Sequence, residues 1–265
     1  MRYVETGDPE PAESPKPYVH PLRTLAGDVV TVYRPHDHRW HKGLQLTASH
    51  VSGQNFWGGG TYVHGQGYVQ LDNNGTMRHD TLDVTADGLR GTLTWRTSYG
   101  EPWVAEERAL TIAAVDPGNG SWELHWRSTL TGLREDPLAF GSPTTHGRPM
   151  AGYSGLFWRG PRDFTGGELI GPDDRGGEEL MGQRADWVAF HGRHDEVDRE
   201  STLVFVPEQD CDWFVRTEWF AAVNPSWAFH REFPLARGES VSVGYRIVIA
   251  TGAWDRERIG KYLRS

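Results

Sequence analysis

The stretch SVSVGYRIVI, Ser240–Ile249, shows most clearly which fold the chain adopts. Every second residue from Val241 to Ile249 is apolar or aromatic, and most of the residues between them are polar or small. A period of two places alternate side chains on opposite faces of a β-strand. Val248 departs from the pattern because it falls on the otherwise polar face. The stretch therefore predicts a strand with one buried face.

The same alternation recurs along the chain. It is found in GTLTWRTSY (91–99), ERALTIAAV (107–115) and SWELHWRSTL (121–130). STLVFVP (201–207) is more continuously apolar, which is typical of a central strand. Asn74-Gly75 and Asn119-Gly120 are dipeptides that favour tight hairpins. These patterns together predict many antiparallel strands joined by turns.

Helical periodicity is almost confined to DRERIGKYLRS, 255–265. We therefore expect an all-β protein, a single large antiparallel β sandwich with long loops and a short C-terminal helix. Residues 1–16 are polar and rich in Pro and Glu, which predicts an N-terminal tail. The sandwich domain is expected over residues 17–252, and a short helix or tail over 253–265. The Gly-rich, charged segment 159–183 predicts a functional or mobile loop.

Composition limits the classes of function. The chain has 265 residues, with 27 Lys and Arg against 36 Asp and Glu, for a formal charge of −9. An acidic chain is a poor partner for nucleic acid or an anionic membrane. Cys211 is the only cysteine, so no intrachain disulfide can form. The first residues lack the apolar core of a signal peptide, and no apolar run reaches the ~18 residues of a membrane span. We expect a soluble, cytoplasmic protein.

Tryptophan is abundant, with 12 residues. Such a number suits the core of a large β sandwich, and we expect most of these side chains to be buried. A few could instead offer flat apolar surfaces on which sugar rings stack.

The densest group of titratable residues is RPHDHRWHKGL, Arg34–Leu44. His36 and His38 would share one face of an extended chain, and His-x-His spacing can present two imidazoles to one metal. The third ligand would be His41 or a carboxylate. Two other interpretations are a structural turn around Asp37 and imidazoles that contact a substrate without metal. A divalent metal therefore stays open, with His38 and His41 as its ligands if one binds.

A pair of adjacent glutamates supplies the candidate carboxylate. In PWVAEERALTI (102–112) the even positions carry the apolar side chains, so Glu106 is predicted to face the core and Glu107 to face outward. Glu107 is the candidate site carboxylate. The alternative is an ordinary surface ion pair with Arg108 or Arg96.

Further along the chain, His146 and several arginines are interleaved with aromatic residues, a combination that suits carbohydrate or carboxylate recognition. The candidate catalytic residues are His38, His41, His146 and Glu107. The candidate substrate-binding residues are His20, Arg39, Trp57, Arg148, Arg159, Arg216 and His230. Glycine-rich nucleotide loops, cysteine pairs for zinc and a Gly-x-Ser-x-Gly elbow are all missing from the sequence, so no nucleotide cofactor is expected.

The opening KPYVHPL (16–22) and the residues Asp37, His38, His41, Gly43 and Leu44 resemble the "methane oxygenase PmoA" family, whose function is unknown. NFW (55–57), EER (106–108), WVAFHG (187–192) and GESVSVGYRIVIATG (238–252) extend the resemblance over nearly the whole chain. Trp40 stands where that family often has His, and His36 where it commonly has Pro, so the pattern supports His38 and His41 over His36.

The resemblance implies a galactose-mutarotase-like β supersandwich and a setting in sugar catabolism beside Gfo/Idh/MocA-type oxidoreductases. A methane oxygenase activity does not fit, because the chain has no membrane helices. We expect a carbohydrate-active enzyme with histidine general acid–base chemistry, which cleaves a keto-glycoside by elimination or hydrolysis. The alternatives are a mutarotase or epimerase, a metal-dependent enzyme and a non-catalytic sugar-binding module. The particular sugar and the oligomeric state stay open.

Overall fold

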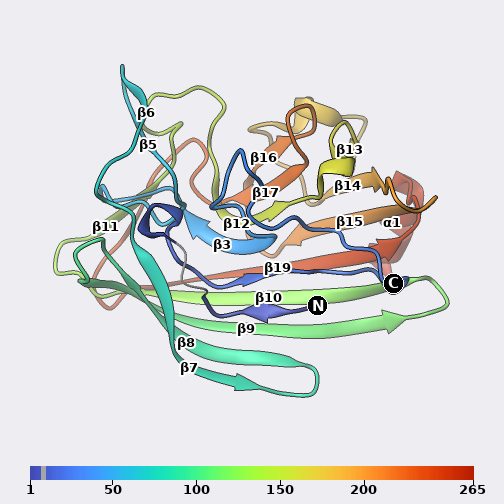
Figure 1. Ribbon diagram of the computed structural model, residues 1–265, viewed down its shortest axis with the longest axis horizontal. Helices are drawn as coiled ribbons and strands as arrows, with labels where there is room; N and C mark the ends of the chain where they lie inside the picture. Colours follow the sequence, from blue (N-terminus) through green and yellow to red (C-terminus); the bar gives the residue numbers. More distant parts are fainter. Residues whose placement is uncertain (7–9) are drawn as a thin grey trace.

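Two antiparallel sheets make up most of the computed structural model, which describes residues 1–6 and 10–265 (Figure 1). The larger sheet has eight strands in the order β13 (Glu168–Ile170), β14 (Val188–Arg193), β15 (Glu200–Pro207), β19 (Ser240–Thr251), β10 (Ser121–Gly132), β9 (Pro102–Asp116), β8 (Gly88–Arg96) and β7 (Thr76–Val84). The smaller has six, in the order β1 (Tyr3–Val4), β2 (Tyr18–Val19), β3 (Leu44–Ala48), β12 (Ser154–Arg159), β17 (Ala222–Ser226) and β16 (Asp212–Arg216). The all-β sandwich expected from the sequence is confirmed.

Shorter elements surround the sheets. Three strands form a small sheet, β18 (Phe233–Leu235), β11 (Leu138–Gly141) and β4 (His50–Val51), and β5 (Thr61–Val63) pairs with β6 (Gly67–Val69) as a hairpin. Short 3₁₀ turns lie at Pro11–Glu13, Arg162–Phe164 and Gly177–Leu180, and one α-helix, α1 (Arg256–Arg264), follows the last strand. Within the described residues, no helix is long and apolar enough to cross a membrane.

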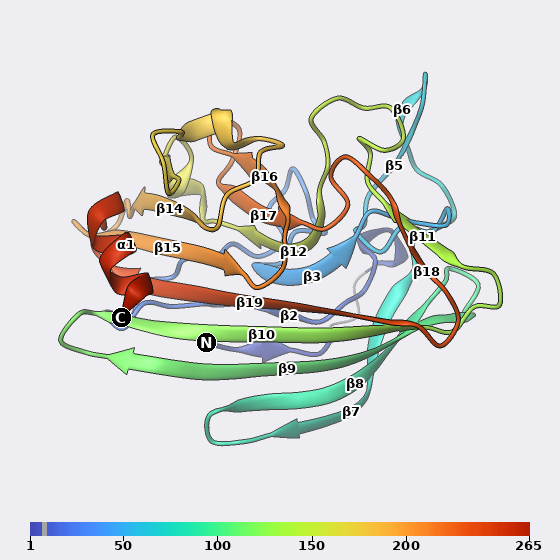
Figure 2. The ribbon, with the colours of Figure 1, turned by 180° about the vertical axis from the view of Figure 1, so that it is seen from behind.

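The surroundings of strand β19 explain both the alternation in its sequence and the exception at Val248. Tyr245, Ile247 and Ile249 point into the main core between the two large sheets. Val248 points to the opposite face, where Ile259 of α1 and Trp254 cover it. Figure 2 shows α1 beside the ends of β14, β15 and β19. The C-terminal helix therefore gives this strand a second buried face.

Most tryptophans are buried, as expected. The main core and the layer under α1 contain Trp95, Trp122, Trp126, Trp158, Trp187, Trp213 and Trp254. Trp219 is the clear exception, with 79% of its surface exposed. It lies on the connection between β16 and β17.

A buried ion pair lies between the sheets. Glu106 points inward, as its sequence position predicts, and Arg108 Nε donates to Glu106 Oε1 over 2.7 Å. Trp95 and Ser128 also donate to the carboxylate, and both charged side chains are inaccessible to water. Burial raises the pKa of Glu106, but the Arg108 guanidinium outweighs it, so the pKa lies below its usual value.

We expect Glu106→Gln to lower the free energy of unfolding by about 3–5 kcal/mol, because it leaves the Arg108 charge buried without its counter-charge. Glu107→Gln is the matched control. Glu107 is exposed on the same strand, and its change should stay within about 0.5 kcal/mol. Urea unfolding followed by tryptophan fluorescence measures both. Equal effects of the two substitutions would show that the buried pair is not a major source of stability.

The N-terminal segment differs from the tail expected over residues 1–16. Residues 7–9 of that segment lie outside the described residues. On one side of them Tyr3–Val4 pairs with β2, and on the other side Glu13, Ser14 and Lys16 are buried. These described residues are therefore part of the fold. Glu13 is buried because its partners, among them Arg34, lie far along the sequence.

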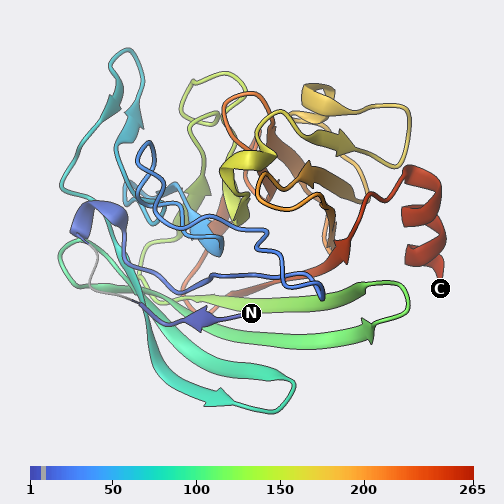
Figure 3. The ribbon, with the colours of Figure 1, turned by 45° about the vertical axis from the view of Figure 1, so that its right-hand side comes forward.

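The six-stranded sheet has two different faces. Leu44 and Leu46 of β3 and Trp158 of β12 point into the main core. Phe157 of β12 and Ala222 of β17 point the other way and pack with Trp57. The β5–β6 hairpin rises on that side, away from the eight-stranded sheet (Figures 1 and 3). This outer face carries the candidate site.

Candidate active site

A cavity of about 820 Å³ opens on the outer face of the six-stranded sheet. Aromatic side chains supply much of its surface, and charged groups supply the rest. It is lined by Asp37, His38, Trp40, His41, Trp57, Gly58, Gly60, Tyr68, Arg148, Tyr153, Phe157, Glu178, Phe214, Arg216, Glu218, Trp219 and Phe220. Its size and its mixture of apolar walls with a few polar groups are typical of a small-molecule site.

The loop 34–42 brings two of the sequence-predicted histidines to the cavity. Its ends are joined by a hydrogen bond from Arg34 N–H to the His41 carbonyl, 3.0 Å. Glu13 holds the same loop from beneath, because its carboxylate accepts from Arg34 Nη2 at 2.5 Å and lies 3.1 Å from Lys42 Nζ. Burial raises the pKa of Glu13, but hydrogen bonds from Arg34 and Lys42 outweigh it and lower the pKa. The loop is therefore fixed by buried charges.

His38 and His41 stack in parallel at the cavity wall. Their ring centroids are 4.7 Å apart, with an angle of 10° between the planes. Phe157 lies 4.6 Å from the His41 ring, and Trp57 meets it edge-on. His41 is almost completely buried, and His38 is half-buried. The two imidazoles thus share one apolar surrounding but differ in exposure.

Their hydrogen bonds give the two rings opposite roles. Asp37 Oδ2 lies 3.0 Å from His38 Nδ1, so this nitrogen carries the proton and donates to the carboxylate. Arg159 Nη1 lies 2.8 Å from His41 Nδ1, and since a guanidinium only donates, this nitrogen must be the acceptor. In the neutral rings, His38 Nε2 is then an acceptor and His41 Nε2 is a donor. The assignment follows from the partners of each ring.

The electrostatics keep both rings neutral near pH 7. Burial lowers the pKa of His38, and the Asp37 carboxylate partly opposes this effect. Burial, reinforced by the charges of His38 and Arg159, holds the pKa of His41 well below its usual range. Burial raises the pKa of Asp37, but hydrogen bonds from His38 and Arg159 outweigh it and keep the carboxyl ionised.

The titration of His38 tests this arrangement. We expect the His38 imidazole to titrate below 6.5 in the wild type and lower still in Asp37→Asn, because the substitution removes the negative charge that stabilises the imidazolium. NMR of the ring nitrogens as a function of pH measures both values. A His38 pKa that rises or stays constant in Asp37→Asn would contradict the assigned hydrogen bond.

Other parts of the cavity lining carry a different set of groups. Tyr68 and Tyr153 are joined through their hydroxyls at 2.7 Å, and Arg148 donates to Tyr68. Arg216 forms an ion pair with Glu178 at 3.0 Å. Trp219 and Glu218 lie at the exposed rim, on the connection between β16 and β17. Four distant segments of the chain therefore meet around one space.

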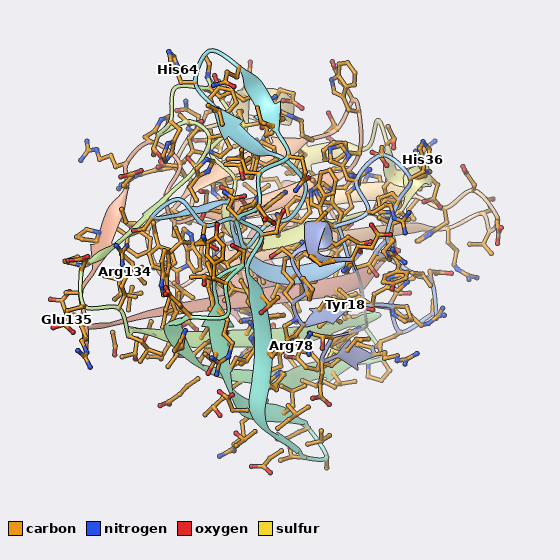
Figure 4. All side chains as sticks on the ribbon, turned by 60° about the vertical axis from the view of Figure 1, so that its left-hand side comes forward. Tyr18, His36, His64, Arg78, Arg134 and Glu135 are labelled. Atoms are coloured by element: carbon orange, nitrogen blue, oxygen red, sulfur yellow. The ribbon has the colours of Figure 1, made fainter. Side chains whose placement is uncertain are left out.

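The structure brings together several of the side chains expected from the sequence. His38, His41, Trp57, Arg148 and Arg216 line the cavity. Arg159 lies directly behind it and contacts Asp37 and His41. His36 lies at the periphery and accepts a hydrogen bond from Arg162 (Figure 4).

Other predicted residues do not line this cavity. Glu107 is exposed on β9 of the eight-stranded sheet, because the pleat turns it away from the core. His146 stacks on His50 at 4.2 Å and lies 3.2 Å from Glu232. The remaining three predicted residues contact other groups outside the cavity lining. His20 contacts Thr31, Arg39 lies 3.5 Å from Glu13, and His230 contacts the Gly182 carbonyl.

Sequence reasoning missed Tyr68, Glu178, Glu218 and the exposure of Trp219. Tyr68 lies in β6, the second strand of a glycine-rich hairpin, and Glu178 lies in the long segment 159–183, for which a functional loop was expected. No local pattern distinguishes these residues from ordinary surface side chains. Their role depends on which loops meet in space.

Among the described residues, no group of three or more His, Cys, Asp or Glu side chains is placed to hold a metal ion. Each Nδ1 of the histidine pair already has a protein partner. Any ion would therefore have to bind through the Nε2 atoms.

These features define an all-β sandwich protein with a neutral histidine pair in an aromatic-lined cavity. The chain belongs to a family of unknown function, DUF6807, whose sequence profile matches residues 1–264. That description names no activity and does not include the methane oxygenase label. No curated protein matches the chain.

Two solved structures are similar in part. One, provisionally assigned as an aldose 1-epimerase from Escherichia coli K12, shares 14% identity at a TM-score of 0.38 over 89% of this chain and 82% of its own. The other, provisionally assigned as a kojibiose phosphorylase from the human microbiome, shares 6% identity at a TM-score of 0.34 over 71% of this chain. The chain spans only 23% of that second protein.

Proposed function

We propose that the chain is a carbohydrate-active enzyme that transfers a proton on a sugar bearing a carbonyl group. The observation that supports this most is the stacked histidine pair. His38 offers an unprotonated Nε2 backed by Asp37, and His41 offers an Nε2–H backed by Arg159. A base beside a neutral hydrogen-bond donor is what the abstraction of a proton next to a carbonyl requires.

The cavity lining supports a sugar as the ligand. Trp57 and Phe157 give apolar surface beside the histidines, and the exposed Trp219 gives another at the rim. Sugar rings have apolar faces that pack on such surfaces and hydroxyls that bond to the polar groups between them. Asp37 and Glu178 each form an ion pair with an arginine, so their negative charges are largely balanced within the protein.

The chemistry follows from the assigned tautomers. His38 Nε2 takes the proton from the carbon next to the carbonyl, and the C–H electron pair moves to the carbonyl oxygen, which becomes an enolate. His41 Nε2–H donates a hydrogen bond to that oxygen. In a keto-glycoside the enolate re-forms the ketone, a C=C bond forms between the deprotonated carbon and its neighbour, and the C–O bond at that neighbour breaks. The departing oxygen takes the proton held by His38. Protonation of the enolate by solvent on the opposite face would give an epimer instead.

This route requires a carbonyl on the sugar. A ketone at a ring carbon must be supplied by an oxidation step, and Gfo/Idh/MocA-type oxidoreductases, implied by the family resemblance, catalyse that class of reaction. An elimination needs no second carboxylate, which agrees with the position of Glu107 away from the cavity.

Exchange of solvent deuterium tests the proton transfer directly. We expect the enzyme to incorporate deuterium next to the carbonyl of 3-keto-glucosides in D₂O, followed by NMR. His38→Gln should slow this exchange by about 10²–10⁴-fold, the usual contribution of a general base. The rate should fall as the pH drops through the pKa of His38, because the base must be unprotonated. His36→Gln is the matched control, since His36 belongs to the same loop but does not line the cavity.

The same experiment separates the alternatives. Exchange with release of the aglycone identifies elimination, and exchange with inversion identifies epimerisation. Interconversion of anomers without exchange at carbon identifies a mutarotase. Binding of the sugars that leaves all of these rates at background, in wild type and His38→Gln alike, would contradict the proposal and indicate a binding module.

Trp219 provides a separate prediction. Because its side chain is exposed at the rim, Trp219→Ala should leave the free energy of unfolding within about 0.5 kcal/mol of wild type. It should weaken sugar binding about tenfold if the ring stacks on it, measured by calorimetry. Unchanged affinity would remove Trp219 from the binding surface.

A further inference from the structure

Arg148 differs from the other arginines at the cavity. Arg216 pairs with Glu178 and Arg159 pairs with Asp37, both at 3.0 Å. Within the described residues, Arg148 has no carboxylate within 4.0 Å, and its hydrogen-bond partner is the neutral hydroxyl of Tyr68. A guanidinium has five N–H donors, so most of those of Arg148 are free for a ligand.

The surroundings hold Arg148 in place without neutralising it. Its guanidinium lies 4.8 Å from the centre of the Tyr68 ring, and the Tyr68 hydroxyl is joined to that of Tyr153 at 2.7 Å. Tyr153 is partly buried, and desolvation of its hydroxyl raises its pKa well above the usual value, so it stays uncharged. The result is a half-buried cation with two hydroxyls behind it.

The carboxylates of the cavity are placed differently. Asp37 and Glu178 are already paired, and Glu218 is exposed at the rim, where water solvates it. No described ion pair joins Glu218 to Arg148. An unpaired and half-buried cation is therefore a stronger recognition group than an exposed carboxylate.

We infer that the sugar bound in this cavity is acidic and that Arg148, supported by Tyr68 and Tyr153, binds its carboxylate. The inference rests on the proposed function, since it names the class of sugar that the histidine pair acts on. A planar carboxylate matches the fork of the guanidinium, and one negative charge matches one free cation.

A phosphate fits less well. A sugar phosphate carries nearly two negative charges at neutral pH and is usually held by several donors of positive charge. Among the described residues that line the cavity, Arg216 is already paired with Glu178, so a second negative charge would find no further free guanidinium beside Arg148. The ligand class is thus a uronic acid or a uronide, with the ring on the aromatic surfaces and the carboxylate against Arg148.

Matched pairs of ligands test the inference. The probes are D-glucuronate, D-galacturonate and D-mannuronate, each compared by calorimetry with its neutral parent hexose and with the hexose 6-phosphate. We expect at least one uronate to bind about tenfold to a hundredfold more tightly than its parent, with an affinity that falls as salt is raised. Arg148→Gln should reduce the affinity for that uronate to the affinity for the parent hexose. It should change the affinity for the parent hexose less than twofold.

Two further variants complete the design. Arg148→Lys, which keeps the charge but loses the fork, should restore only part of the preference. Arg78→Gln removes an exposed arginine on β7, outside the cavity lining (Figure 4). It should leave the affinities for the uronates and for the hexoses unchanged. Thermal unfolding of each variant shows that it is folded.

The outcomes separate this inference from the proposed function. If neutral hexoses bind as tightly as the uronates, or if Arg148→Gln weakens both equally, the acidic-sugar subsite is wrong while the proposed enzyme stands. If the 6-phosphates bind more tightly than the uronates, the group recognised by Arg148 is a phosphate, and the assignment to a carboxylate is overturned. If none of the sugars binds, the acidic-sugar inference is overturned, while deuterium exchange on the keto-glucosides still decides the proposed function.

Discussion

The buried guanidinium of Arg159 donates through its two Nη atoms to His41 and Asp37, and these two hydrogen bonds set the chemistry of the site. Arg159 lies at the end of β12, with almost none of its side chain exposed. It donates to Asp37 and to His41, which lie more than a hundred residues earlier in the chain, and the Phe220 ring lies 3.8 Å from its charge. One cation thereby makes His41 Nδ1 an acceptor and also holds the carboxylate that orients His38. The opposite tautomers of the two neighbouring rings thus follow from Arg159 at His41 and from Asp37 at His38.

The sequence predicted the fold where the physical signal was local. Alternation in β19 identified a strand and its inward face, and the odd position of Val248 became clear once α1 was seen to cover the other face. The inward direction of Glu106 also followed from the pleat. The same reasoning could not tell that the outward face of β9, where Glu107 lies, meets solvent rather than a binding site. Alternation gives the two faces of a strand but not what each face meets.

The candidate site could be predicted only in part for a related reason. His38 and His41 belong to one short loop, so their spacing was visible in the sequence. Tyr68, Glu178 and Trp219 come from separate connections, and the topology alone brings them to the same cavity. The N-terminal segment shows a similar limit. Its polarity indicated a tail over residues 1–16, yet Glu13, Ser14 and Lys16 are buried, and partners such as Lys42 lie elsewhere in the chain.

The position of Glu13 has a practical consequence for anyone who shortens this protein. A chain trimmed to begin at residue 17 would lose what looks like a dispensable leader, together with Lys16, which donates to the carbonyl of Trp57. Lys42, only 2% exposed, would be left in the interior without its counter-charge, and Arg34 would be released at the base of the histidine loop. The histidine-bearing loop at the cavity would then lose the ion pairs that hold it. Glu13 and Lys16 thus support the candidate site from outside the loop that forms it.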